Sequence, residues 1–189
     1  MKTNKTFQLT MAAMFSALIA VGSWISIPLP FTPVPVNLAT LFVFLTGAIL
    51  GAKWSIGAVG VYLALGAVGA PVFSGFSSGV GILVGPTGGY LVGYLVGAIV
   101  IGLLTSKLAN PNLASSGTLK FLAYIISFLV GLTVIYTLGT IWFIHVTGQT
   151  VVAAIMACIV PFLIGDVIKI LGATLLAMRL KPFVDKHLA

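Results

Sequence analysis

The sequence predicts an all-α, polytopic membrane protein with six transmembrane helices and both termini in the cytoplasm. The first observation is composition: of 189 residues, 60% are hydrophobic and 6% are charged, and the mean hydropathy is +1.23. Apolar runs of this length exceed what a soluble core needs, so the bilayer acts as the solvent. The second observation is that nearly all basic residues lie between these runs or near their ends. No hydrophilic stretch is long enough to fold separately, so residues 1–189 are expected to form one membrane domain.

Six apolar segments carry the predicted helices. The second and third are shorter than the roughly 20 residues that cross a bilayer, so we expect them to be tilted, interrupted or sheltered by neighbours. The first is too long for a signal peptide and does not end in a small-residue cleavage site, so it is predicted to remain as a helix. Apolar length, read against proline, glycine and charge, places the segments at 7–27, 37–51, 54–70, 87–107, 118–143 and 150–180.

The basic residues predict the orientation in the membrane. Eight of the nine fall on one side, whereas the connections 28–36, 71–86 and 144–149 contain no lysine or arginine. By the positive-inside rule the basic side is cytoplasmic, as in a protein of a bacterial plasma membrane. These residues form no stripe with interleaved aromatic side chains, so nucleic acid is not an expected partner. The eight are Lys2, Lys5, Lys53, Lys107, Lys120, Arg179, Lys181 and Lys186.

Asp166 and Lys169 stand apart, because they lie inside the last apolar segment. Each charge at the centre of a membrane helix costs about 2.5 to 3.5 kcal/mol on insertion scales. Their i, i+3 spacing places both side chains on one helix face, within reach of each other. They form either an internal ion pair that ties helices together or a polar ligand site. A carboxylate accepts hydrogen bonds from N–H groups and a lysine binds a carbonyl or carboxylate, which suits an amide-like or zwitterionic solute.

The outer connections supply further candidates. PLPFTPVPVN, residues 28–37, has four prolines, so it is predicted to be extended, either as a stiff loop or as a cap over an outward-facing pocket. Asn37, at its end, is predicted either to cap the next helix or to bind a ligand. In GPTGGY, residues 85–90, the proline and glycines indicate a turn whose N–H groups can hold an oxygen atom. This turn leads into a helix with a glycine at every fourth position from Gly85 to Gly97, a face that another backbone or a ligand can approach closely.

Enzyme chemistry finds little support in the sequence. Asp166 is the only acidic residue outside the tail, no Ser-His or Cys-His arrangement is visible, and the Walker phosphate-binding motif is missing. Any dependence on ATP is therefore expected to come from a partner. His145, in a predicted outer loop, has no second metal ligand near it, so neither a metal nor a cofactor is expected.

Small residues mark one face of the first segment. Ala13 and Ala17 form a small-x-x-x-small pair, and Ser16 and Ala20 form a neighbouring one. Such pairs let two helices approach closely. They serve either packing within the chain or docking of another membrane protein.

Three stretches, in this order and at these spacings, resemble the BioY family, the biotin-specific S components of energy-coupling-factor (ECF) transporters. They are PVPVNLATLFVFLTGAILG at 33–51, GAVGAPVFSGFSSGVGILVGPTGGYLVGY at 66–94 and PFLIGDVIKILGATLLA at 161–177. The resemblance implies a six-helix biotin receptor that associates with a transmembrane coupling subunit and two cytoplasmic ATPase subunits.

The same resemblance implies roles for individual residues. Asp166 and Lys169 match a polar pair that would bind the polar groups of biotin. Ala13 and Ala17 would face the coupling subunit. Ala39 stands where many members of the family have a glutamine. Further substrate-binding residues by this resemblance are Tyr90, Gly88, Gly89 and Asn37.

Two other functions are compatible with the residues alone. One is a self-sufficient secondary or proton-coupled carrier with Asp166 as the proton site. Against it, six spans are few for two inverted repeats, and no internal repeat is visible. The other is a membrane-assembly subunit whose glycine and alanine faces serve packing only. Stabilisation by a ligand is expected for the biotin receptor and for the carrier, but not for the assembly subunit.

Overall fold

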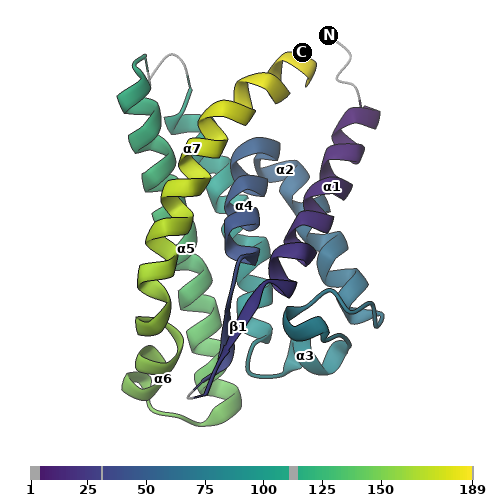
Figure 1. Ribbon diagram of the computed structural model, residues 1–189, viewed down its shortest axis with the longest axis vertical. Coiled ribbons are helices and arrows are strands. Elements are labelled where there is room, and N and C mark those ends of the chain that lie inside the picture. Colours follow the sequence, from purple (N-terminus) through teal and green to yellow (C-terminus); the bar gives the residue numbers. More distant parts are fainter. Residues whose placement is uncertain (1–4, 31, 111–114, 189) are drawn as a thin grey trace.

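The computed structural model describes residues 5–30, 32–110 and 115–188. The chain forms an elongated bundle of helices with a small β-hairpin near one end (Figure 1). In the described residues, five helices are long and apolar enough to cross a membrane, with α6 and α7 taken together as Val151–Lys186. The helices are α1 Lys5–Trp24, α2 Ala39–Ala67, α3 Val80–Val84, α4 Gly88–Leu108, α5 Gly117–Thr147, α6 Val151–Cys158 and α7 Leu163–Leu188.

Helix α2 reverses direction at Gly51. A straight helix of 29 residues would be about 43 Å long. The chain instead returns to where α2 begins: the side-chain amide of Asn37, two residues before the helix, donates to Ser74 Oγ, seven residues after it, at 2.7 Å. Gly51 has φ 71° and ψ 174°, a conformation open to glycine and strained for other residues. The predicted segments 37–51 and 54–70 are therefore the two halves of α2. The described residues form six membrane segments, which confirms the predicted all-α, six-helix membrane fold, and the cytoplasmic location of the termini stays a prediction.

The predicted extended connection is confirmed as an antiparallel β-hairpin. Its strands are β1 Ser26–Leu29 and β2 Thr32–Asn37, paired at Ser26 with Asn37 and at Ile27 with Val36. The sequence predicted extended chain here but not the pairing. Prolines are tolerated in both strands because each strand has an unpaired edge.

The prediction of one helix over 150–180 is wrong. The chain leaves α6 at Ile159, forms a 3-10 turn at Val160–Phe162, and only then begins α7. Pro161 lies in that turn and has no N–H to donate to a helix, which accounts for the break. His145 was also misplaced, because α5 extends to Thr147 and contains it in its last turn.

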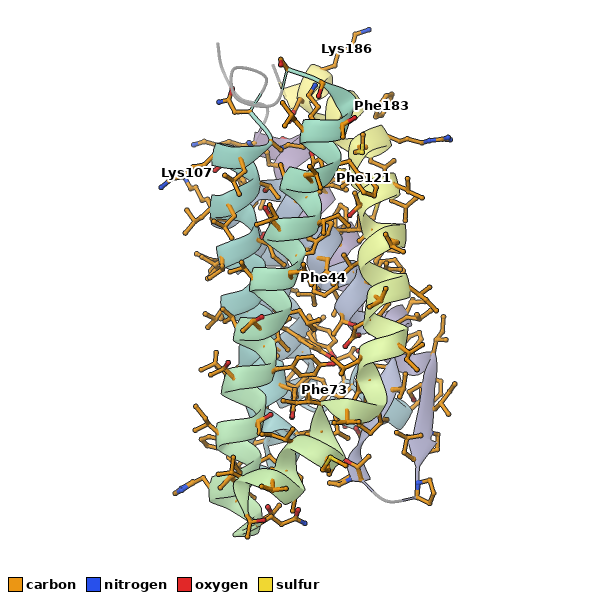
Figure 2. All side chains as sticks on the ribbon, turned by 90° about the vertical axis from the view of Figure 1, so that its left-hand side faces the viewer. Phe44, Phe73, Lys107, Phe121, Phe183 and Lys186 are labelled. Atoms are coloured by element: carbon orange, nitrogen blue, oxygen red, sulfur yellow. The ribbon has the colours of Figure 1, made fainter. Side chains whose placement is uncertain are left out.

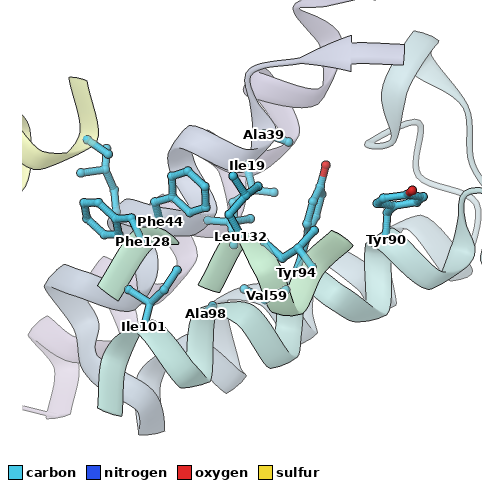
Figure 3. Packing of buried hydrophobic residues seen from close by; sticks show 14 of the residues in the cluster. Ile19, Ala39, Phe44, Val59, Tyr90, Tyr94, Ala98, Ile101, Phe128 and Leu132 are labelled. Carbon is cyan, nitrogen blue, oxygen red and sulfur yellow. The ribbon is translucent and has the colours of Figure 1, made fainter. Parts of the chain in front are cut away.

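The glycine face of α4 receives the backbone of α5. A Cβ on Gly89 would lie 2.2 Å from Trp142 Cβ and 2.8 Å from the Leu138 carbonyl oxygen, and one on Gly93 would lie 3.1 Å from Ile135 Cα. Figure 3 shows part of the core, where Phe44 and Phe128 stack with ring centroids 5.4 Å apart. The predicted close approach on this face is thus made by protein backbone.

The two ends of the bundle differ in charge. Helix α1 begins and α7 ends at the same end (Figure 1). Lys107 and Lys186 lie at that end, and Phe73 lies toward the other (Figure 2). The end with the β-hairpin, α3 and α6 carries the outer connections that the sequence shows to be free of lysine and arginine.

Candidate ligand-binding site

A cavity of about 220 Å³ opens between strand β2, the first turns of α2 and α7, and the facing sides of α4 and α5. Part of its wall is apolar, formed by Pro33, Pro35, Phe73, Leu91, Leu132 and Ile135. The polar part consists of Asn37, Thr40, Tyr90, Tyr94, Tyr136, Asp166 and Lys169, together with serine and threonine hydroxyls. This size and mixture suit a small solute with an apolar body and a few polar groups.

Asp166 and Lys169 lie in the first two turns of α7 and face the cavity. Both are buried, with 3% and 7% of their surfaces exposed. Lys169 Nζ lies 2.9 Å from Asp166 Oδ1, which confirms the predicted contact on one helix face. The break before α7 positions this pair, because it starts the helix beside the cavity.

Two residues that the sequence did not single out complete the polar cluster. The hydroxyl of Tyr136 on α5 donates to Asp166 Oδ2. Lys169 Nζ donates to Thr40 Oγ1 on α2 at 3.0 Å. Tyr136 lies in a long apolar helix among several hydroxyl residues, and nothing in its spacing indicated that it would meet Asp166. The pair thus links three helices.

This cluster retains hydrogen-bonding capacity. An ammonium group has three donors, and Asp166 and Thr40 use two of those on Lys169. A carboxylate has about four acceptor positions, and Lys169 and Tyr136 occupy two of those on Asp166. The described interactions therefore leave the pair able to offer one donor and further acceptor positions to a ligand.

Tyr90 and Tyr94 project from one side of α4 into the cavity (Figure 3). The hydroxyl of Tyr90 lies 3.2 Å from Thr140 Oγ1. Cys158, the only cysteine, is buried and also lines the cavity. The predicted ligand-binding residue Tyr90 is therefore in place to contact a bound molecule.

Asn37 lines the cavity but already has two partners. Its Oδ1 accepts from the Ala39 N–H at 3.1 Å, in the manner of a cap at the start of α2, and its amide donates to Ser74. The contact with Ser74 joins β2, which precedes α2, to the short turn Ser74–Phe76, which follows it. Leu38 occupies the N-cap position, so the predicted N-cap was wrong by one residue, although Asn37 still binds the first helical N–H. A ligand contact by Asn37 stays a prediction.

Gly88 and Gly89 are not part of the cavity wall. A Cβ on Gly88 would lie 1.8 Å from the Leu83 carbonyl oxygen, so the residue is held against α3. Gly89 is held against α5 by the contacts described above. Their closeness to protein backbone gives them a packing role beside Tyr90, and direct ligand binding by either stays a prediction without a supporting contact.

The remaining predicted site lies on α1. Ala13 and Ala17 are exposed, whereas Ser16 and Ala20 are buried against the bundle. The two small-residue pairs thus face opposite ways, and only the Ser16 pair is used within the chain. Among the described residues, no three histidine, cysteine or acidic side chains gather as metal ligands would.

Known proteins share this arrangement over nearly its whole length. A family model described as the BioY family matches residues 1–186. A protein named biotin transporter BioY from Thermotoga maritima is 45% identical over 174 residues, covering 92% of this chain and 95% of that protein. A probable biotin transporter BioY from Pyrococcus horikoshii is 34% identical over 177 residues, covering 94% of this chain and 98% of that protein.

A solved structure agrees with these sequences. The crystal structure of the S-component for biotin from an ECF-type ABC transporter has a TM-score of 0.85 and 30% identity to this chain. The similarity covers 96% of this chain and 95% of that one. On the family model and the identities together, the chain belongs to the BioY family.

Proposed function

We propose that this protein is the biotin-binding S component of an ECF-type ABC transporter in the cell membrane. The observation that carries the proposal is the buried pair of Asp166 and Lys169 on the wall of a cavity of about 220 Å³. An ion pair of this kind is costly in a membrane and is retained where a ligand or a partner compensates it. The protein is a transport component and not an enzyme, so the energy for uptake comes from the ATPase subunits of its partner module.

The geometry favours the ureido end of biotin at the charged pair. A ureido group places a carbonyl acceptor between two N–H donors, and this set can meet the remaining donor of Lys169 and acceptors of Asp166 together. The carboxylate of biotin would instead add an uncompensated charge to a buried pair that is neutral overall, which is unfavourable. The fused rings and valerate chain would then lie along the apolar wall near Phe73 and Leu132, with the carboxylate toward the outer end.

Ligand analogues test this orientation. Biotin methyl ester removes the carboxylate charge, and 2-iminobiotin replaces the ureido group with a cationic guanidinium that would face Lys169. We expect the ester to bind within about tenfold of biotin, and 2-iminobiotin to bind about 100-fold more weakly, since charge-assisted hydrogen bonds are lost. Calorimetric titration of the purified protein measures both. The opposite order would place the carboxylate at Lys169.

The exposed face of α1 would bind the coupling subunit of the ECF module. Ala13 and Ala17 leave space for a partner helix to approach this face. We expect Ala17→Leu to abolish co-purification with the module and biotin uptake, because the larger side chain holds the helices apart. Biotin affinity of the isolated protein should not change. Ala64→Leu, an equal enlargement at an exposed position of α2, should assemble normally. Normal assembly of Ala17→Leu would remove α1 from the interface.

Uptake measurements separate this function from a self-sufficient carrier. Cells that lack any ECF module and express this protein should accumulate biotin only when the coupling subunit and both ATPases are supplied. Uptake that proceeds without the module and follows the proton gradient would favour the carrier, with Asp166 as the proton site.

A further inference from the structure

A second cavity, of about 430 Å³, lies at the basic end of the bundle. Its walls are the end of α4, the beginning of α5 and the last turns of α7. Lys107, Phe121 and Lys186 mark this end in Figure 2, far from Phe73 on the first cavity. We propose that this second cavity binds the phosphate of an anionic phospholipid head group.

The charged residues of the cavity favour an anion. Lys120 on α5 and Lys181 on α7 line it, and Asp185 is the only acidic residue there. The chain has two acidic residues in all, and the other, Asp166, lies beside the first cavity. The three side chains in the second cavity therefore sum to one positive charge, at a place where phosphate oxygens can be bound by charge-assisted hydrogen bonds.

Tyr124 supplies a further hydrogen-bonding group to the cavity. Only 5% of its surface is exposed, its ring stacks on Phe128 at 6.0 Å, and it lines the cavity. Among the described residues, no hydrogen bond is made by its hydroxyl, whereas those of Tyr62 and Tyr90 lie within hydrogen-bonding distance of Ser23 and Thr140. The described residues contain no buried side-chain nitrogen or oxygen without a partner, so the ring of Tyr124 is buried while its hydroxyl is reachable from the cavity and available to a molecule there.

The lysines add further donors beside that hydroxyl. Lys181 Nζ donates to the Ile49 carbonyl and to Asp185 Oδ1, both at 3.0 Å, which leaves one of its three donors. Lys120 lies on the same face of α5 as Tyr124, one turn earlier, and forms no ion pair among the described residues. Together these groups can supply several hydrogen bonds to one phosphate.

The surroundings favour a lipid over free phosphate. Apolar side chains near Lys120 and Tyr124 along α5 are exposed, with exposed fractions of 46% for Leu119 and 48% for Leu122. Acyl chains of a lipid could lie against them while its head group enters the cavity. If the basic end is cytoplasmic, it also faces the leaflet whose lipids are anionic.

Titration of the delipidated full-length protein in neutral detergent tests the site. Phosphatidylglycerol should raise the melting temperature saturably, and native mass spectrometry should retain one such lipid per chain. Phosphatidylcholine and inorganic phosphate at equal concentration should do neither. The double variant Lys120→Gln/Tyr124→Phe keeps the stacked ring. It should raise the half-saturating concentration of phosphatidylglycerol about tenfold, because one cation and one hydrogen bond are lost.

Lys107→Gln is the matched control. It removes one positive charge at the same end from an exposed lysine outside the cavity. It should leave the half-saturating concentration of phosphatidylglycerol within about twofold, because exposed charges are screened. An equal loss of affinity for phosphatidylglycerol in both variants, or no loss in the double variant, would refute a defined site. Protection by inorganic phosphate as strong as that by the lipid would refute the lipid source.

Discussion

Asp166→Asn is expected to lower the affinity for biotin by about 100-fold, because charge-assisted hydrogen bonds from the ligand to the carboxylate are lost. The amide of asparagine is nearly the same size as the carboxylate, so the shape of the cavity is retained. Calorimetric titration of the folded variant measures the change. A variant that binds biotin as tightly as the wild type would remove the carboxylate from the site.

This variant alone does not separate a ligand site from a structural ion pair. Asp166→Asn leaves Lys169 buried without its counter-charge, which should also lower the melting temperature. The double variant Asp166→Asn/Lys169→Met removes both charges, and its melting temperature should recover toward that of the wild type. Biotin binding should stay lost in it. Biotin binding that recovers together with stability would mean that the pair serves the fold alone.

Gly102→Ala is expected to destabilise the bundle by about 3 kcal/mol or to prevent folding. A Cβ at this position would lie 2.3 Å from the backbone nitrogen of Ala52 and 2.6 Å from the carbonyl carbon of Gly51. These are backbone atoms at the reversal of α2, so they cannot rotate away as a side chain can. Loss of the helical circular-dichroism signal on heating the purified variant measures the change.

Gly57→Ala is the control for this prediction. Gly57 lies in α2, whereas Gly102 lies in α4 and packs against the reversal of α2. A Cβ at Gly57 would have nothing within 4 Å. Its melting temperature should equal or exceed that of the wild type, because alanine favours helix. If Gly102→Ala melted like Gly57→Ala, the packing of the α2 reversal against α4 would be incorrect.

The candidate site was predictable only where the residue type was itself exceptional. Asp166 and Lys169 could be found because charges inside an apolar helix are rare and their spacing fixes a common face. Tyr136 and Thr40 could not, because a hydroxyl residue in a membrane helix is ordinary and their role depends on how three helices cross. For Gly88 and Gly89 the glycine pattern indicated that another group approaches closely. It did not indicate whether that group is a ligand or the backbone of a neighbouring helix.

The fold was predictable to a similar extent. Apolar lengths gave six segments, and Gly51 allows the second and third to be joined by a single residue. The break at Pro161 was missed because the apolar run continues through it, and hydropathy does not register a missing N–H donor. The strand pairing of Ser26 with Asn37 depends on contacts between distant residues, which local composition does not encode.

The most direct test of the central claim, that the buried pair belongs to a biotin site, is a calorimetric titration of the purified protein without any partner. Biotin should bind saturably at one site per chain and raise the melting temperature, while riboflavin and thiamine should give neither heat nor stabilisation. A folded protein that does not bind biotin in this experiment would contradict the account and leave Asp166 and Lys169 as an ion pair of the fold.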